Sequence, residues 1–308
     1  MYDDILVPTD GSEHAGRAAR QAEYLAELFD ATVHLLSVVD VQGAAGAFNA
    51  GGVDKAFVTR LEAEGERVVE TVRTEITGVD AVRTAVVRGR PDEEILGYAD
   101  ENDVDLVVMG THGRTGLTRY VAGSVTERVL RLSDVPVLTV RTVDEEMSEY
   151  GEVLVPTDGS EYAEAAVDHG LAVAEAAGAR VHAVNVVDLG SMTASATYGL
   201  PDDVVARIEA DGEAAVEEVA SRARGRGLEA VTDVRRGSAA RTLLDYVDRK
   251  AIDLVTMGTA GRTGLDRYLL GSTTEGLVRR SDAPVLAVNA RDRVTDSESE
   301  PRSEQKWE

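Results

Sequence analysis

The chain has 308 residues, 43% of them apolar, and carries 32 Lys or Arg against 56 Asp or Glu, a formal net charge of −24. This acidic balance argues against binding to nucleic acids or to anionic membranes, because both need basic protein surface. Cysteine is absent, which excludes disulfides, thiolate chemistry and zinc–thiolate sites.

Hydrophobic periodicity predicts strands and helices that alternate along the first half of the chain. The predicted strands are Ile5–Pro8, Val33–Val39, Ala81–Val87, Leu106–Met109 and Val137–Val140. The predicted helices are Glu13–Phe29, Val53–Thr77, a helix with Pro91 in its first turn, and Ser124–Leu132, while residues 42–52 are predicted as a loop. This alternation is typical of a doubly wound α/β fold, in which helices cover both faces of a parallel sheet.

The same pattern returns 148 residues later. ILVPTDGSE at 5–13 returns as VLVPTDGSE at 153–161, and residues 109–140 share 21 of 32 positions with residues 257–288. A shift that is the same near both ends of the copy means that there is no net insertion. We therefore predict two tandem domains, residues 1–142 and 149–290, with a short acidic linker between them and a disordered acidic tail at 291–308.

Several residues follow the predicted strands of both copies at the edge where such sheets bind ligands. In the first copy these are Asp10, the strand end Val38–Asp40, Gly110 and the end of a glycine-rich loop at Gly123 and Ser124; in the second they are Asp158, Val186–Asp188, Gly258, Gly271 and Ser272. The helix that begins after each loop offers free backbone N–H groups and the positive end of its dipole. Such a helix start favours a phosphate group.

Turn formation and helix capping explain several of these residues as well as a ligand does. The segments Ser124–Glu127 and Ser272–Glu275 have the capping-box pattern, and Asp10 and Asp158 are candidates to start the helix that follows them. The recurrence of every glycine in both copies favours a ligand. A catalytic histidine common to both glycine-rich loops is excluded, because His112 corresponds to Ala260.

Each copy resembles a universal stress protein domain, over residues 3–141 and 151–289. The motifs that carry the resemblance are ILVPTDGS and VLVPTDGS early in each copy, and MGTHGRTG and MGTAGRTG late in each copy. The ATP-binding branch of the family has the pattern G-x2-G-x9-G-[ST], which fits residues 110–124 and 258–272. The resemblance implies, for each copy, a five-stranded parallel sheet of order 3-2-1-4-5, as in adenine nucleotide alpha-hydrolase-like folds.

By this resemblance, each repeat binds ATP, and Mg²⁺ accompanies the triphosphate. Asp10 and Asp158 would bind ribose hydroxyls, and the backbone near Val38 and Val186 would contact adenine. The implied nucleotide-binding residues of the first repeat are Pro8, Thr9, Asp10, Val38, Met109, Gly110, Gly113, Arg114, Gly123, Ser124 and Val125. Those of the second repeat are Pro156, Thr157, Asp158, Val186, Met257, Gly258, Gly261, Arg262, Gly271, Ser272 and Thr273.

Two residue types in this set have a second interpretation. Arg114 and Arg262 are either phosphate ligands or solvated surface arginines, and Met109 and Met257 are either pocket wall or core. The resemblance also implies that the two copies pair. Family members pair through the fifth strand, whose edge is otherwise unpaired. Residues 136–140 and 284–288 are therefore expected to meet within one chain as a pseudo-twofold pair, and a further homodimer stays open.

Three functions remain in view. The first is a stress-response protein that binds ATP and acts as a nucleotide-dependent regulator. The second is a weak ATPase or adenylyl-processing hydrolase, and the third is a dimeric scaffold that binds no nucleotide. Phosphoryl transfer needs cations around the γ-phosphate, and neither glycine-rich loop contains a lysine. The sequence therefore favours binding over efficient catalysis, and the intact glycine pattern argues against the scaffold.

The charge also predicts where the protein works. Residues 291–308 carry four basic and six acidic groups, so they supply only −2 of the −24, and the remaining acid must coat the folded surface. Such a surface repels itself unless salt screens it, and at 1 M salt the Debye length is about 3 Å. We expect a halophile's salt-rich cytoplasm, because the N-terminus also lacks the basic and apolar regions of a secretory signal.

Overall fold

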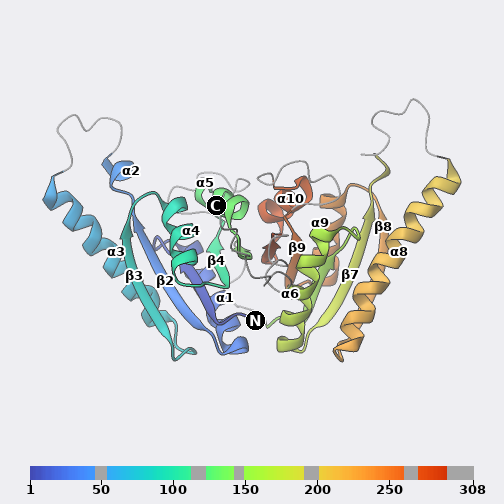
Figure 1. Cartoon of the computed structure of the whole chain (residues 1–308), viewed down its shortest axis with the longest axis horizontal. Helices are drawn as coiled ribbons and strands as arrows, with labels where there is room; N and C mark the ends of the chain where they lie inside the picture. Colours follow the sequence, from blue (N-terminus) through green and yellow to red (C-terminus); the bar gives the residue numbers. More distant parts are fainter. Residues whose placement is uncertain (46–53, 112–122, 142–148, 191–200, 260–269, 290–308) are drawn as a thin grey trace, which may run out of the picture.

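The computed structural model describes residues 1–45, 54–111, 123–141, 149–190, 201–259 and 270–289 (Figure 1). The first half contains β1 (Asp4–Pro8), α1 (Glu13–Phe29), β2 (Thr32–Val39), α2 (Val41–Ala45), α3 (Lys55–Glu75), β3 (Val82–Arg88), α4 (Pro91–Glu101), β4 (Leu106–Gly110), α5 (Ser124–Leu132) and β5 (Val137–Val140). The second half contains β6 (Glu152–Pro156), α6 (Glu161–Ala177), β7 (Arg180–Val187), α8 (Asp202–Gly225), β8 (Ala230–Arg236), α9 (Ala239–Lys250), β9 (Leu254–Gly258), α10 (Ser272–Arg280) and β10 (Val285–Val288).

The predicted strands and helices of the first half are confirmed, with ends that differ by at most two residues. One prediction is wrong: residues 42–45 were expected in a loop but belong to the short helix α2. Asp40 starts this helix, because its Oδ1 accepts a hydrogen bond of 2.7 Å from the N–H of Gly43. A capping aspartate, with alanines at positions 44 and 45 of the turn that follows it, favours a helical turn over a loop.

All ten described strands form one sheet of order β3-β2-β1-β4-β5-β10-β9-β6-β7-β8. Within each half the strands are parallel and follow the order 3-2-1-4-5, as the resemblance implied. The two five-stranded sheets are halves of one, because β5 and β10 pair antiparallel with Leu138 opposite Leu286. The expected pairing of the fifth strands is thus confirmed within the chain, and Figure 1 shows the two halves on either side of it.

Helices cover both faces of this sheet and enclose two hydrophobic cores. One core lies under α1, α3, α6 and α8, and the other lies under α4, α5, α9 and α10. Each core contains buried residues of both halves, so the repeats share their interior across the central strand pair. The predicted apolar face of α1 is confirmed by its buried residues Ala15, Ala18, Ala19, Ala22, Leu25 and Ala26.

The repeat shift is not constant inside the helix that follows the second strand. Gly65 on α3 packs against Ser37, and Gly212 on α8 packs against Asn185. The strand residues are related by a shift of 148, whereas the two glycines are related by a shift of 147. The absence of a net insertion therefore hides a one-residue displacement of α8 along the sequence, compensated before and after the helix.

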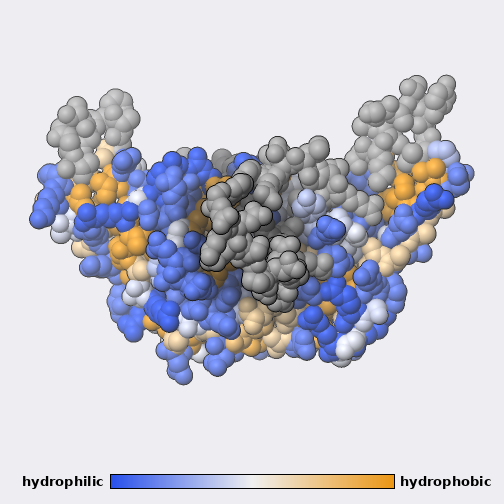
Figure 2. Space-filling model, in the orientation of Figure 1, coloured by the Kyte–Doolittle hydropathy of each residue, from blue (hydrophilic) through white to orange (hydrophobic). Residues whose placement is uncertain are grey.

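The visible surface is mostly hydrophilic, with hydrophobic residues gathered along α3 and α8 (Figure 2). Within the described ranges, no helix combines the length and the apolar character that a membrane span requires. Most of the predicted linker and the whole predicted tail lie outside the described residues.

Candidate functional site

Each half has a pocket at the carboxyl ends of its strands. The first, of about 260 Å³, is lined by Pro8, Thr9, Asp10, Val38, Met109, Gly110, Gly123 and Val125. The second, of about 390 Å³, is lined by Pro156, Thr157, Asp158, Val186, Met257, Gly258, Gly271, Ser272 and Thr273. These residues were expected to act together, and the fold brings them to one place in each repeat.

Five residues of the expected set do not line a pocket among the described residues. Ser124 lies at the exposed start of α5 and is not part of the first pocket's lining, although Ser272 lines the second. Gly113, Arg114, Gly261 and Arg262 lie outside the described residues.

Other lining residues were not expected from the sequence. In the first pocket they are Ala15, Leu36, Pro91, Ile95 and Thr126. In the second they are Ala163, Val184, Asn185, Ile208, Gly212, Ala239, Leu243 and Thr274, whereas Val187 and Asp188 belong to the strand end that the sequence had placed at this edge. Leu36 could have been predicted from the sequence, since it lies two residues before Val38 and so shares its face of the strand. The contributions of α4 and α8 depend on packing that the sequence does not show.

The helix starts at the pockets carry no side-chain cap. The N-cap residues are Gly123 and Gly271, and neither helix start has a side-chain capping hydrogen bond. The predicted capping boxes are therefore wrong, because Ser124 and Ser272 are the first helical residues rather than the caps. The N–H groups of the first turn are left without intrahelical partners or a capping side chain, which makes each start a candidate anion site.

A threonine hydrogen bond holds each helix start in place. Thr126 donates a hydrogen bond of 2.9 Å to the carbonyl of Gly110, and Thr274 donates one of 2.8 Å to the carbonyl of Gly258. The glutamates of the predicted capping boxes form ion pairs one helical turn later instead of capping the helix. Glu127 pairs with Arg131, and Glu275 pairs with Arg279 at 2.7 Å. The helix start is thus tied to the end of β4 or β9 while its first N–H groups stay available.

The turn after β1 holds Asp10 at the rim of the first pocket. Its Oδ1 accepts a hydrogen bond of 3.0 Å from the N–H of Ser12, and Asp158 repeats this with Ser160 at 3.0 Å. The serines cap the following helices, since Ser12 Oγ accepts from the N–H of Ala15 at 3.2 Å. The capping role predicted for the aspartates is therefore wrong, and their carboxylates instead order the turn beside the pocket.

Glycine occupies these loop positions for different physical reasons. A Cβ on Gly110 would lie 2.8 Å from the Cβ of His14 and 2.9 Å from its carbonyl carbon, so this glycine lets β4 pack against α1. Gly123 and Gly271 both have φ of −60°, which every residue can adopt. Backbone strain therefore does not require glycine there, although both glycines line their pockets.

The described lining residues supply acidic but no basic side chains: Asp10 in the first pocket, and Asp158 and Asp188 in the second. Within the described residues, attraction for an anion therefore comes from backbone N–H groups and the helix dipole. No group of three or more His, Asp or Glu among these residues could hold a metal ion.

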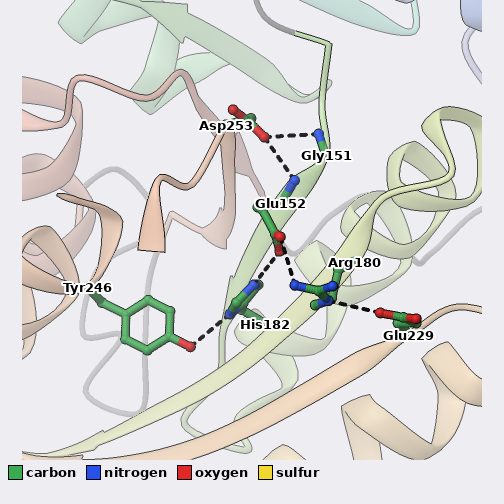
Figure 3. A network of polar contacts seen from close by, with 7 residues as sticks. All are labelled: Gly151, Glu152, Arg180, His182, Glu229, Tyr246 and Asp253. Atoms are coloured by element: carbon green, nitrogen blue, oxygen red, sulfur yellow. Dashed lines mark hydrogen bonds and ion pairs between the residues drawn. The ribbon is translucent and has the colours of Figure 1, made fainter. Parts of the chain in front are cut away.

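A second polar cluster lies at the amino ends of the strands, away from the pockets (Figure 3). His182 on β7 is buried, with Nδ1 at 2.8 Å from the hydroxyl of Tyr246 and Nε2 at 2.6 Å from Oε2 of Glu152. Arg180 donates hydrogen bonds to Glu152 at 2.9 Å and to Glu229 at 3.0 Å. The cluster links β6, β7 and α9.

The first half repeats the centre of this cluster. His34 is buried between the hydroxyl of Tyr98, at 3.1 Å, and Oδ1 of Asp4, at 2.7 Å. Sequence reasoning missed both clusters, although the two histidines and the two tyrosines are each related by the 148-residue shift. Burial of each histidine between two partners is what a structural cross-link needs, and it leaves no room for a substrate.

The chain has recognisable relatives. A model of the universal stress protein family matches residues 1–141 and 149–289. A universal stress protein of Methanocaldococcus jannaschii is 39% identical over 143 residues, which cover 46% of this chain and 83% of that protein. A universal stress protein of Mycolicibacterium smegmatis is 26% identical over 304 residues, which cover 93% of this chain and 97% of that protein.

A solved structure agrees at the level of the fold. The crystal structure of a universal stress protein from Archaeoglobus fulgidus is 22% identical, with a TM-score of 0.68 over 93% of this chain and 96% of that one. The chain belongs to the universal stress protein family and carries two domains of that family in tandem.

Proposed function

We propose that each repeat binds ATP and that the protein acts as a nucleotide-dependent regulator in a stress response. The observation that carries the proposal is an uncapped helix start beside a pocket at the strand ends, present in both halves. Such a helix start binds phosphate through backbone N–H groups, so it suits a protein that supplies no described basic side chain to the pocket.

The rest of each pocket fits the other parts of a nucleotide. In the first repeat, Leu36, Val38, Ile95 and Met109 supply apolar wall of the kind that accepts a planar base. Asp10 brings a carboxylate, which accepts hydrogen bonds from hydroxyl groups such as those of ribose. The apolar wall thus suits the base, the carboxylate of Asp10 suits the sugar, and the start of α5 suits the phosphates. Mg²⁺ would be bound through the phosphates, whose charge it offsets.

We further propose that binding, rather than hydrolysis, is the activity. Transfer of a phosphoryl group needs positive charge around its equatorial oxygens, and the described lining residues are neutral or acidic. A slow ATPase remains the alternative. The charge of −24 supports a location in a salt-rich cytoplasm, where screening lets an acidic protein hold a polyanion.

Calorimetric titration of the full chain with Mg²⁺–ATP in molar KCl tests the proposal. We expect two ATP molecules bound per chain, because both repeats have the pocket and the helix start. ADP and AMP report the contribution of the phosphates. cAMP serves as a comparison, since one universal stress protein has been solved in complex with it.

The double variant Gly123→Val, Gly271→Val tests whether ATP binds at the two helix starts. Valine adopts the φ of −60° found at both positions, so the fold is expected to persist while the side chains fill phosphate space. Binding should disappear in the titration with the circular dichroism spectrum unchanged. Normal binding by this variant, or no heat from the wild-type chain, would contradict the proposal and favour a scaffold role.

A further inference from the structure

Among the described residues, the pocket of the second repeat extends to α8, whereas the pocket of the first repeat does not extend to α3. Asn185, Val187, Asp188, Ile208 and Gly212 line this part of the second pocket between the end of β7 and α8, and we call it the α8 extension. In the first repeat no described residue of α3 lines the pocket. The two pockets measure about 390 and 260 Å³, so the repeats do not offer the same space to a ligand.

Asn185 presents a hydrogen-bond acceptor in the α8 extension. Its Nδ2 donates a hydrogen bond of 2.7 Å to the carbonyl of Thr157, and the residue is 6% exposed. This bond sets the orientation of the amide, so Oδ1 is the remaining polar atom. None of the described residues donates a hydrogen bond to that Oδ1, and it is not among the fully buried side-chain atoms that lack a partner, so a donor in the α8 extension can reach it.

The backbone of α8 makes room for this amide. A Cβ on Gly212 would lie 2.6 Å from Asn185 Oδ1, so a larger residue at this position would have to displace the amide. In the first repeat, Gly65 faces the smaller Ser37, whose Oγ would lie 3.3 Å from an added Cβ, and Ser37 does not line the pocket. The asparagine and the space around it are thus particular to the second repeat.

We propose that Asn185 Oδ1 accepts a hydrogen bond from the nucleotide bound in the second repeat and makes that repeat the more selective of the two. The donor is an N–H or O–H group, supplied either by the exocyclic amino group of the base or by a ribose hydroxyl. A phosphate is excluded from the α8 extension, because Asn185 Oδ1 and the Asp188 carboxylate both offer acceptors there. This inference rests on the proposed function.

The test measures ligand binding to the second repeat in a Gly123→Val background, where binding to the first repeat is blocked. Asn185→Ser, which installs the residue of the first repeat, is expected to weaken ATP binding about 3- to 10-fold, the size of one neutral hydrogen bond. Purine riboside triphosphate lacks the amino group, and 2′-deoxy-ATP and 3′-deoxy-ATP each lack one hydroxyl. The analogue without the donor should bind the unsubstituted site as weakly as Asn185→Ser binds ATP, and the substitution should not weaken it further.

A merely structural role of Asn185 gives a different result, since loss of its bond to Thr157 would weaken ATP and all three analogues by the same factor. That result overturns the proposal, as does an Asn185→Ser site that binds every ligand normally. ATP binding in the first repeat alone also overturns it. Absence of ATP binding in both repeats of the wild-type chain instead refutes the proposed function. The matched control is Ser37→Ala in a Gly271→Val background, which should leave ATP affinity unchanged.

Discussion

Ser124 and Ser272 show how a single position along a helix changes what a side chain does. At an N-cap, a serine hydroxyl accepts a hydrogen bond from the helix backbone and stabilises the helix by about 1 kcal/mol. These serines follow the N-cap glycines and make no capping hydrogen bond. Their hydroxyls therefore stand beside the first-turn N–H groups, where they could add a hydrogen bond to a bound phosphate.

Ser124→Ala separates the two roles. We expect the free energy of unfolding to change by less than about 0.5 kcal/mol, as at an ordinary surface position. ATP affinity in the first repeat should fall by about 1.5–3 kcal/mol, the range for a hydrogen bond to a charged group. Urea denaturation gives the first quantity, and calorimetry in a Gly271→Val background gives the second. A stability loss of about 1 kcal/mol with unchanged affinity would restore the capping interpretation.

At the scale of elements, the two ends of the strands have different roles. The carboxyl ends carry the pockets, whereas the amino ends carry the buried histidine clusters that tie α4 and α9 to the strands. In the second half, His182 joins Glu152 of β6 to Tyr246 of α9, a helix whose residue Leu243 lines the pocket. The cluster therefore helps to position one wall of the candidate site.

Tyr246→Phe tests this cross-link. Removing the hydroxyl leaves His182 Nδ1 without its partner, and we expect a loss of about 1–3 kcal/mol in the free energy of unfolding. Burial raises the pKa of Tyr246 above its usual value of 10. The unfolded chain therefore loses this proton first, so the tyrosine's contribution is complete below pH 10 and is lost as pH rises through the raised pKa.

The pH dependence supplies the control for this variant. Urea denaturation between pH 8 and 11 should show wild-type stability falling more steeply above pH 10 than that of Tyr246→Phe. Tyr98→Phe in the first half should behave in the same way, because burial also raises the pKa of Tyr98. Equal slopes for wild type and both variants would mean that these phenols do not contribute.

For the whole molecule, a core shared by both repeats favours the folded state, whereas the acidic charge opposes it. The cores and the sheet run through both repeats, so the two halves cannot move apart without exposing β5 and β10. The visible surface is mostly hydrophilic (Figure 2), and the chain carries a net −24. Repulsion among these charges opposes the compact state and weakens as salt rises.

The melting temperature should therefore increase from low salt to molar KCl. Differential scanning calorimetry at several KCl concentrations gives this dependence. A chain truncated after residue 290 is the control and should keep most of it, because residues 291–308 supply only −2 of the charge. Equal melting temperatures in low and molar KCl would show that self-repulsion does not limit stability.

The sequence by itself determined the local structure and the duplication. Apart from the short helix α2, the strands and helices of the first half were predictable to within two residues, because runs such as Leu106–Met109 and the alanine face of α1 depend only on periodicity and on neighbouring turns. The motif residues near Asp10 and Gly123 were also found, since parallel strands bring their carboxyl ends to one edge.

Tertiary structure decided what depends on contacts between distant segments. Periodicity cannot say that Gly123 rather than Ser124 precedes the first turn, because the end of β4 sets where α5 begins through the bond from Thr126. Nor can it show that α8 opens beside Asn185 while α3 closes over Ser37, since both helices carry a glycine and differ by one residue in shift. The sequence thus determined the two edges that carry the candidate sites, and packing decided that their pockets are unequal.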